Sequence, residues 1–233
     1  MIHPLTFSGQ PPVTPELVVP CYRAQLPEGL ADELALAVVD EKPRILAQTP
    51  VPDWCHDVTN LTSRFTLYNL FHIDRPEFLT LEAVIRQEYT NYMQAIGAAV
   101  EPCYIRGWAN AYTQGDRLVW HNHFEAVRGV EGPVWSHISG NVCVQTFGTR
   151  TWYLSPFLGG VGHDEFGNGY EYPADVIGVP NVNGETFLFP SWLVHKTEPN
   201  AHPTLPRITI AYDIIPESVY ARKTGDTLFK RLI

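Results

Sequence analysis

The chain has 233 residues, of which 45% are hydrophobic and 18% are charged, so it is long enough to bury the core of one large globular domain. Its formal net charge of -9, without any cluster of lysine and arginine, argues against binding to nucleic-acid phosphates. The N-terminal residues lack the basic and apolar regions of a signal peptide, and no apolar run is long enough to span a bilayer. We therefore expect a cytoplasmic protein that binds neither nucleic acid nor membrane.

The first hundred residues indicate an extended arm followed by helices. Prolines interrupt residues 1–26 and would break a β-ladder, so this segment is expected to wrap around the core as an irregular arm. Good helix formers, with acidic residues early in the run, predict a helix over residues 28–39. Further prolines predict a loop over residues 43–63. Pro76 then opens a run with apolar residues at three- and four-residue steps, which predicts a second helix ending near Ile96.

From residue 104 onward the chain consists of short apolar or alternating runs separated by glycine, proline and asparagine. Such runs predict β-strands over residues 104–113, 118–124, 134–146, 150–155, 185–189 and 206–214. Regularly spaced short strands are typical of an antiparallel sandwich or jelly roll. We expect one domain over residues 1–233, in which residues 1–100 form the arm and supporting helices and residues 101–233 form the β-rich core.

Three histidines in the β-rich part predict a metal site. His121 and His123 are two residues apart in a predicted strand, so their side chains point to the same face. His195 follows an apolar run over residues 184–194, and it is well placed to supply a third ligand. An isolated His-x-His pair also arises by chance, but the third histidine favours a metal site. Three protein ligands leave coordination positions open, which is typical of catalytic centres.

The residues around these histidines resemble a known pattern. Tyr112, Gly115 and the His121-Asn122-His123 run are similar to the Tyr-x-x-Gly-x5-His-x-Asp motif of prolyl-hydroxylase-like iron(II), 2-oxoglutarate-dependent oxygenases. The resemblance extends over about residues 105–215 and includes Phe189-Pro190-Ser191 before His195. It is strongest to a phage and bacterial subgroup with His-x-His in this place. It implies a mainly β fold with flanking α-helices, the double-stranded β-helix or cupin-like jelly roll.

The resemblance also implies an activity and a set of ligands. Iron(II) would be held by His121, His123 and His195, and the cosubstrate 2-oxoglutarate would chelate the iron. Arg207, Thr209 and Tyr112 would hold the far carboxylate of 2-oxoglutarate. The guanidinium of Arg207 suits a carboxylate, and Thr209 lies on the same strand face as Arg207. With O2, such an enzyme hydroxylates or otherwise oxidises an unactivated C–H bond of a small-molecule or peptidyl substrate.

One residue departs from the family pattern. His123 stands where most such oxygenases have an aspartate or glutamate. An alternative triad therefore consists of His123, Glu125 and His195, because His123 and Glu125 share the same two-residue period. The spacing from Tyr112 and Gly115 favours the triad with His121.

A second resemblance leads to an alternative function. The Gly115 to His123 segment, and the later Gly184, Pro190 and His195, are similar to the two motifs of cupins. This resemblance implies the same three histidine ligands in a dioxygenase or isomerase that does not use 2-oxoglutarate, and only the oxoglutarate hypothesis requires Arg207 and Thr209. A non-catalytic jelly-roll binding protein is a third hypothesis, because one fold hosts many functions. The sequence specifies neither the substrate nor the oligomeric state.

Overall fold

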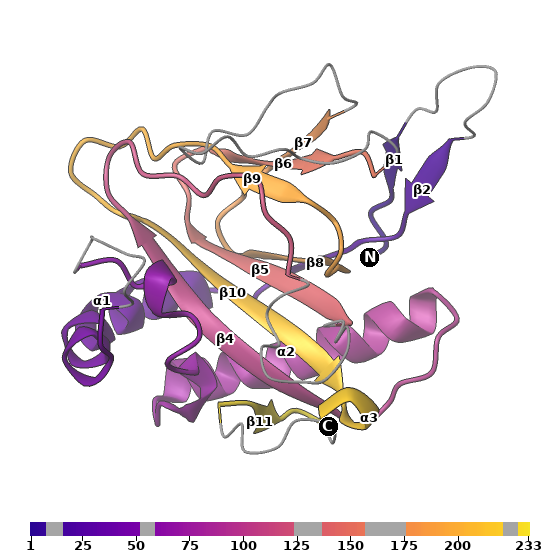
Figure 1. The fold of residues 1–233 in the computed structure, drawn as a ribbon, viewed down its shortest axis with the longest axis horizontal. Coiled ribbons are helices and arrows are strands. Elements are labelled where there is room, and N and C mark those ends of the chain that lie inside the picture. The colour runs from indigo at the N-terminus through magenta and orange to yellow at the C-terminus, as the bar shows by residue number, and fades with distance from the viewer. Residues whose placement is uncertain (8–15, 52–58, 124–136, 157–175, 221–227) are drawn as a thin grey trace.

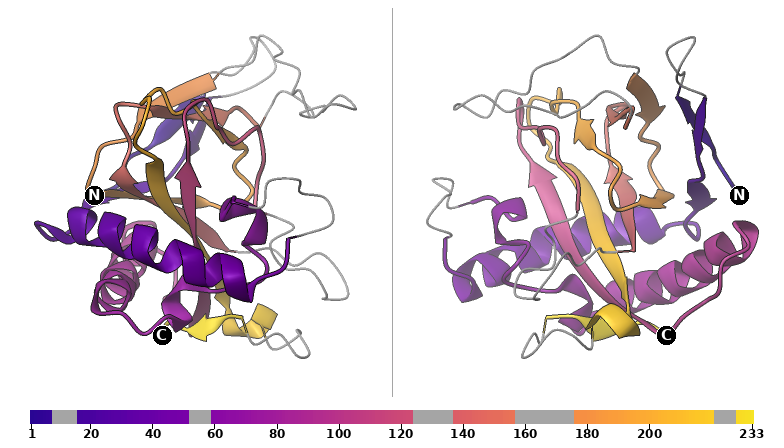
Figure 2. Two further views of the ribbon diagram at one scale, coloured as in Figure 1. Left: turned by 90° about the vertical axis from the view of Figure 1, so that its left-hand side faces the viewer. Right: turned by 45° about the vertical axis from the view of Figure 1, so that its right-hand side comes forward.

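The protein folds into two antiparallel β-sheets that face each other, with two long helices on the outer side of the larger sheet (Figures 1 and 2). This computed structural model describes residues 1–7, 16–51, 59–123, 137–156, 176–220 and 228–233. The larger sheet has six strands, in the spatial order β11 (Lys230–Arg231), β4 (Cys103–Tyr112), β10 (Arg207–Pro216), β5 (Ile138–Gln145), β8 (Glu185–Pro190) and β3 (Tyr22–Gln25). The smaller sheet has three, in the order β7 (Val176–Pro180), β6 (Arg150–Leu154) and β9 (His195–Thr197). The expected mainly β jelly roll with flanking helices is confirmed.

The helices cover the outer face of the six-stranded sheet. Helix α1 (Leu30–Gln48) and helix α2 (Pro76–Ala95) pack their buried faces against apolar side chains of that sheet. Pro76 occupies the start of α2, where its missing N–H and fixed φ are tolerated. Neither these helices nor any other helix among the described residues is long and apolar enough to cross a bilayer. The shorter elements are β1 (Leu5–Phe7), β2 (Leu17–Val19), α3 (Glu217–Tyr220) and the 3-10 turns η1 (Thr62–Arg64) and η2 (Leu70–His72).

The N-terminal third differs from its prediction in two places. The first helix was expected to stop at residue 39, but α1 continues to Gln48 with Pro43 inside it. The helix persists because Ile45 extends its buried stripe, while Pro43 lies on the exposed side. The arm over residues 1–26 is not wholly irregular, because β1, β2 and β3 lie within it and β3 forms an edge of the larger sheet. The second predicted helix is confirmed.

Most predicted strands of the core are confirmed. Those at residues 104–113, 150–155, 185–189 and 206–214 agree with β4, β6, β8 and β10 to within about two residues, and β5 lies within the predicted strand at 134–146. The strand predicted over residues 118–124 is wrong, because the described part of it forms only an isolated bridge between His121 and His195. Strands β7 and β9 were not predicted.

Strand β10 carries two faces of different chemistry. All ten of its residues are buried. Helices cover one face; on the other face β9 of the smaller sheet contacts the Arg207 end, and His123 and Phe229 cover the end with Asp213 and Ile215. Its even-numbered residues, from Ile208 to Ile214, pack into the core below the helices. Arg207, Thr209 and Asp213 alternate with them and face the interior between the sheets. In register, Arg207 pairs with Tyr112 on β4, so their side chains lie on the same inner face.

The close approach of β5 to β10 gives a first prediction. A Cβ atom built at Gly140 would overlap the ring of Tyr212, which is fully buried on the helix side. We expect Gly140→Ala to lower the free energy of unfolding by about 1 to 3 kcal/mol, the usual cost of overpacking. Urea denaturation measures this loss. The loss should shrink when the same substitution is made together with Tyr212→Leu, and an equal loss in both backgrounds would contradict the proposed clash.

A buried carboxyl under the sheet gives a second prediction. Glu88 of α2 accepts a hydrogen bond from Thr186 Oγ1 at 2.6 Å, and burial raises the pKa of its carboxyl from 4.5 to about 7. The folded protein therefore retains a proton that the unfolded chain releases, so the free energy of unfolding falls as the pH rises from about 4.5 to about 7. This contribution amounts to roughly 3 kcal/mol. Urea titrations across this window should show a smaller fall in Glu88→Gln, and an identical fall in both proteins would refute the assignment.

Candidate metal centre

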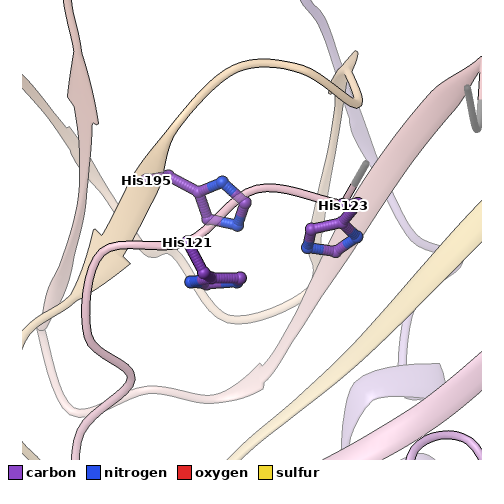
Figure 3. Close-up of side chains that lie close together, drawn as sticks. All are labelled: His121, His123 and His195. Atoms are coloured by element: carbon purple, nitrogen blue, oxygen red, sulfur yellow. The ribbon is translucent and has the colours of Figure 1, made fainter. Parts of the chain in front are cut away.

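The structure brings His121, His123 and His195 together between the two sheets. One ring nitrogen of each histidine lies within 4.8 Å of the others, and Figure 3 shows the three imidazoles turned toward a common space. Main-chain hydrogen bonds hold this arrangement: His121 and His195 exchange N–H···O=C bonds of 3.0 and 2.9 Å. The N–H of His123 donates to the carbonyl of Ser191 at 3.0 Å. The loop after β4 is thus fixed to the segment that leads into β9.

Each imidazole uses its Nδ1 atom for a hydrogen bond. Nδ1 of His121 lies 2.8 Å from the carbonyl oxygen of Val119, and Nδ1 of His195 lies 2.9 Å from that of Leu193. Nδ1 of His123 lies 2.6 Å from a carboxylate oxygen of Asp213. Carbonyl and carboxylate oxygens accept hydrogen bonds, so Nδ1 carries the proton in each ring. Nε2 is then the atom of each ring that can bind a metal ion, and the ring orientations are fixed by the partners of Nδ1.

The electrostatics of the cluster favour the neutral forms of His121 and His195. Desolvation, followed by repulsion from His123, lowers the pKa of His121 to about 3. Desolvation, with His121 and His123 close by, holds the pKa of His195 well below its usual value. Neutral histidine is the form that binds metals, so these two rings do not need to lose a proton first at neutral pH. Within the described residues, this is the only group of histidine, cysteine and carboxylate side chains with metal-binding geometry.

The sequence analysis missed a carboxylate network beside His123. Asp213 is fully buried on β10; besides the bond to His123, its Oδ1 atom accepts a hydrogen bond from Ser139 Oγ at 2.7 Å. Arg106 Nη2 lies 3.6 Å from Asp213 Oδ2. Burial raises the pKa of Asp213, but the charges and hydrogen bonds of these neighbours outweigh it and lower the pKa below its usual value. The only signal in the sequence was an aspartate among the apolar residues in the second half of this strand, and nothing local identifies its partner.

A second group of polar side chains surrounds Arg207. This arginine is fully buried, its Nη2 donates to Thr197 Oγ1 at 2.9 Å, and its guanidinium lies 4.9 Å from the ring centre of Tyr112. Its Nε and Nη1 atoms have no hydrogen-bond partner among the described residues. Buried donors are almost always satisfied in proteins, so two open donors on one buried guanidinium suit an incoming acceptor such as a carboxylate.

The other two residues expected to bind a carboxylate lie beside Arg207. Tyr112 is its register partner, and Thr209 is two residues along the same strand face. Thr209 Oγ1 accepts a hydrogen bond from Asn110 Nδ2 at 3.2 Å, and the Tyr112 hydroxyl lies 3.1 Å from Thr62 Oγ1. The sequence analysis did not identify Asn110, although it precedes Tyr112 by the two-residue period. Nothing local in the sequence indicates Thr62, which comes from a distant turn.

The residue required by the alternative triad, Glu125, lies outside the described residues. The described geometry therefore brings together His121, His123 and His195 and gives no position for the carboxylate of Glu125.

Comparisons with known proteins give a fold but no family. No family model matches the sequence, and no curated protein matches it. Among solved structures, a prolyl-4-hydroxylase of Pseudomonas putida is similar, with 12% identity, coverage of 84% of this chain and 88% of that one, and a TM-score of 0.52. The non-haem, alpha-ketoglutarate-dependent carbocyclase SnoK from nogalamycin biosynthesis has 10% identity, coverage of 91% and 92%, and a TM-score of 0.56.

A third similar structure is EctD from S. alaskensis with 2-oxoglutarate and 5-hydroxyectoine. It has 14% identity, coverage of 85% of this chain and 73% of that one, and a TM-score of 0.55. At identities this low, the three structures establish a shared jelly-roll fold. The chemistry of this chain must be argued from its own side chains.

The open donors of Arg207 give a third prediction. A buried guanidinium without a carboxylate partner is costly, and burial lowers its pKa accordingly. We expect Arg207→Met to raise the free energy of unfolding of the ligand-free protein by about 1 kcal/mol or more. Arg64→Met is the matched control: Arg64 is equally buried, but it donates to the carbonyls of Asn60 and Thr49, so its loss should destabilise the protein. Similar destabilisation by both substitutions, measured with urea, would contradict an uncompensated charge at Arg207.

Proposed function

We propose that the protein is a non-haem iron(II), 2-oxoglutarate-dependent oxygenase. The observation that carries this proposal is the combination of three metal-facing imidazoles with a buried arginine that has two open donors, both within one jelly-roll interior. The two groups approach each other along β9, because His195 is its first residue and Arg207 Nη2 donates to Thr197, two residues further along the same strand. A dicarboxylate ligand fits such a site, with one end at the metal and the other at the arginine.

The roles of the residues follow from their donor atoms. His121, His123 and His195 would bind iron(II) through Nε2 and leave positions open for two further ligands. Arg207 would hold the far carboxylate of 2-oxoglutarate through its guanidinium, assisted by the hydroxyls of Thr209 and Tyr112. A bound iron would supply the oxidative chemistry: one oxygen atom of O2 would enter succinate as 2-oxoglutarate loses CO2, and the other would be used to oxidise a C–H bond of the substrate.

The aromatic surroundings of the metal-facing histidines suit oxidative chemistry. The ring of Trp108 lies 5.6 Å from His123, and the ring of Phe189 lies 4.8 Å from His195, measured between ring centres. Tyr153 contacts His195 from the smaller sheet, with ring centres 5.8 Å apart. These side chains limit the access of water to the histidines, which protects reactive species from side reactions.

The similar structures support the same class, since SnoK is alpha-ketoglutarate-dependent and EctD was solved with 2-oxoglutarate. The substrate class we propose is a small molecule or a peptidyl side chain.

A second candidate function rests on the metal ligands alone. Three imidazoles without a carboxylate also suit a cupin-type dioxygenase or isomerase that uses no 2-oxoglutarate. Such an enzyme would not need the open donors of Arg207, and for this reason we favour the oxoglutarate-dependent class.

Anaerobic titration of the metal-free protein with iron(II) and then 2-oxoglutarate tests the proposed function. We expect the weak visible charge-transfer band of a bidentate oxoglutarate chelate, and we expect it to be lost in His195→Ala. In Arg207→Met the dissociation constant for 2-oxoglutarate should rise about 100-fold, the loss expected for two charge-assisted hydrogen bonds.

Arg64→Met is the control for this titration as well, and it should bind 2-oxoglutarate like the unmodified protein. Iron binding without the band would contradict the oxoglutarate-dependent assignment and favour the cupin-type alternative. An unchanged dissociation constant for 2-oxoglutarate in Arg207→Met would contradict the assignment of Arg207.

A further inference from the structure

We propose that Asp213 is a positioning residue for the metal, and that a closed circuit of hydrogen bonds through Ser139 and Ser191 fixes the imidazole of His123. This inference rests on the proposed metal site. It adds a role for three residues that do not themselves face the metal.

The circuit begins and ends at His123. Its backbone N–H donates to the carbonyl of Ser191 at 3.0 Å, and its Nδ1 atom lies 2.6 Å from Asp213 Oδ1. Between these ends, Ser139 Oγ lies 2.9 Å from Ser191 Oγ and 2.7 Å from Asp213 Oδ1. The backbone and the ring of one histidine are therefore tied to the same four-residue network. Ser139, Ser191 and Asp213 are all fully buried, so water does not compete for these bonds.

The direction of each bond follows from the number of protons available. An ionised carboxylate only accepts, so the single hydroxyl proton of Ser139 points to Asp213. Ser191 must then donate its own hydroxyl proton to Ser139. Asp213 Oδ1 accepts from both Ser139 and His123 Nδ1, which places the proton of the imidazole on Nδ1. Nε2 of His123 is then the ring nitrogen available for the cluster with the other two histidines.

The network also bears on the one residue of this site, His123, that departs from the oxygenase motif. Where the resembling oxygenases place a carboxylate ligand, this chain places His123, and a carboxylate lies directly behind that histidine instead. Hydrogen bonding to a carboxylate makes an imidazole a more basic ligand and fixes its orientation. Asp213 thus returns part of the missing negative charge to the site through the ring of His123.

Arg106 keeps the carboxylate in place from the opposite side. Its Nη2 lies 3.6 Å from Asp213 Oδ2, and its guanidinium lies 5.6 Å from the ring centre of Trp108 and 5.0 Å from that of Phe229. Removal of Asp213 alone would take this carboxylate away from the buried charge of Arg106, and breaking a buried ion pair in this way is strongly destabilising. A test of Asp213 must therefore neutralise both members of the pair.

The experiment compares Arg106→Met with the double variant Arg106→Met, Asp213→Leu. The two proteins differ only at residue 213. In Arg106→Met, Asp213 keeps its hydrogen bonds to Ser139 and His123, and in the double variant the whole ion pair is replaced by apolar residues, which is usually tolerated. Cobalt(II) affinity, measured against a competing chelator without 2-oxoglutarate, should be 10- to 100-fold weaker in the double variant. In the cobalt(II)-bound single variant, NMR should show the exchangeable Nδ1–H of His123 as a hyperfine-shifted resonance, and this resonance should be lost in the double variant.

Ser139→Ala provides a test in which the charges of Arg106 and Asp213 both remain. It removes one hydrogen bond to Asp213 Oδ1, so we expect a smaller loss of cobalt(II) affinity, of about three- to tenfold, which corresponds to roughly 1 kcal/mol. Equal cobalt(II) affinity in the single and double variants, with a change only in the melting temperature of the metal-free protein, would show that Asp213 stabilises the fold and does not position the metal.

The outcomes separate this inference from the proposed function. If cobalt(II) binds equally well in all variants, the role of Asp213 is overturned while the metal site stands. If the unmodified protein does not bind cobalt(II), the metal site and this inference both fail. If 2-oxoglutarate does not bind, the cobalt(II) affinities of the variants still test the role of Asp213, because 2-oxoglutarate is not added in that measurement.

Discussion

Burial of strand β10 on both faces is the constraint on which the rest of the structure depends. Its outer residues pack into the core below α1 and α2, and this apolar packing holds the strand in place. Its inner residues include Arg207 and Asp213, which are both fully buried. Buried charges cost free energy unless they are paired. The apolar packing of the outer face of β10 therefore has to hold the strand in place. The packing of α1 and α2 against the outer face thus offsets the cost of burying two charged side chains on the inner face.

The two buried charges differ in how they are compensated, and this difference separates their functions. Asp213 is compensated within the protein by His123, Ser139 and Arg106. Arg207 has a single hydrogen bond to Thr197, and two of its donors are open among the described residues. A charge that is satisfied internally suits a structural or positioning role, whereas a charge that is left open suits an external ligand. On this account Arg207 binds the cosubstrate and Asp213 supports the metal ligands.

Sequence patterns predicted much of this site because strand periodicity is a local property. Arg207 and Thr209 were placed on one face by their two-residue spacing, and the register of β10 with β4 brings Tyr112 beside them. The same rule was applied to His121 and His123, but no regular strand forms there. Those rings lie together because main-chain bonds to His195 and Ser191 fix the loop, and such long-range pairing has no local signal. Asp213 was missed for the same reason, since its partner His123 is 90 residues away in the chain.

The central claim is that one ion and one dicarboxylate share the interior between the two sheets. Anomalous diffraction from crystals grown anaerobically with iron(II) and 2-oxoglutarate tests it most directly. The account predicts an iron peak between the Nε2 atoms of His121, His123 and His195, with continuous density from the iron to the guanidinium of Arg207. An iron peak bound by Glu125 in place of His121, or 2-oxoglutarate density away from Arg207, would contradict it.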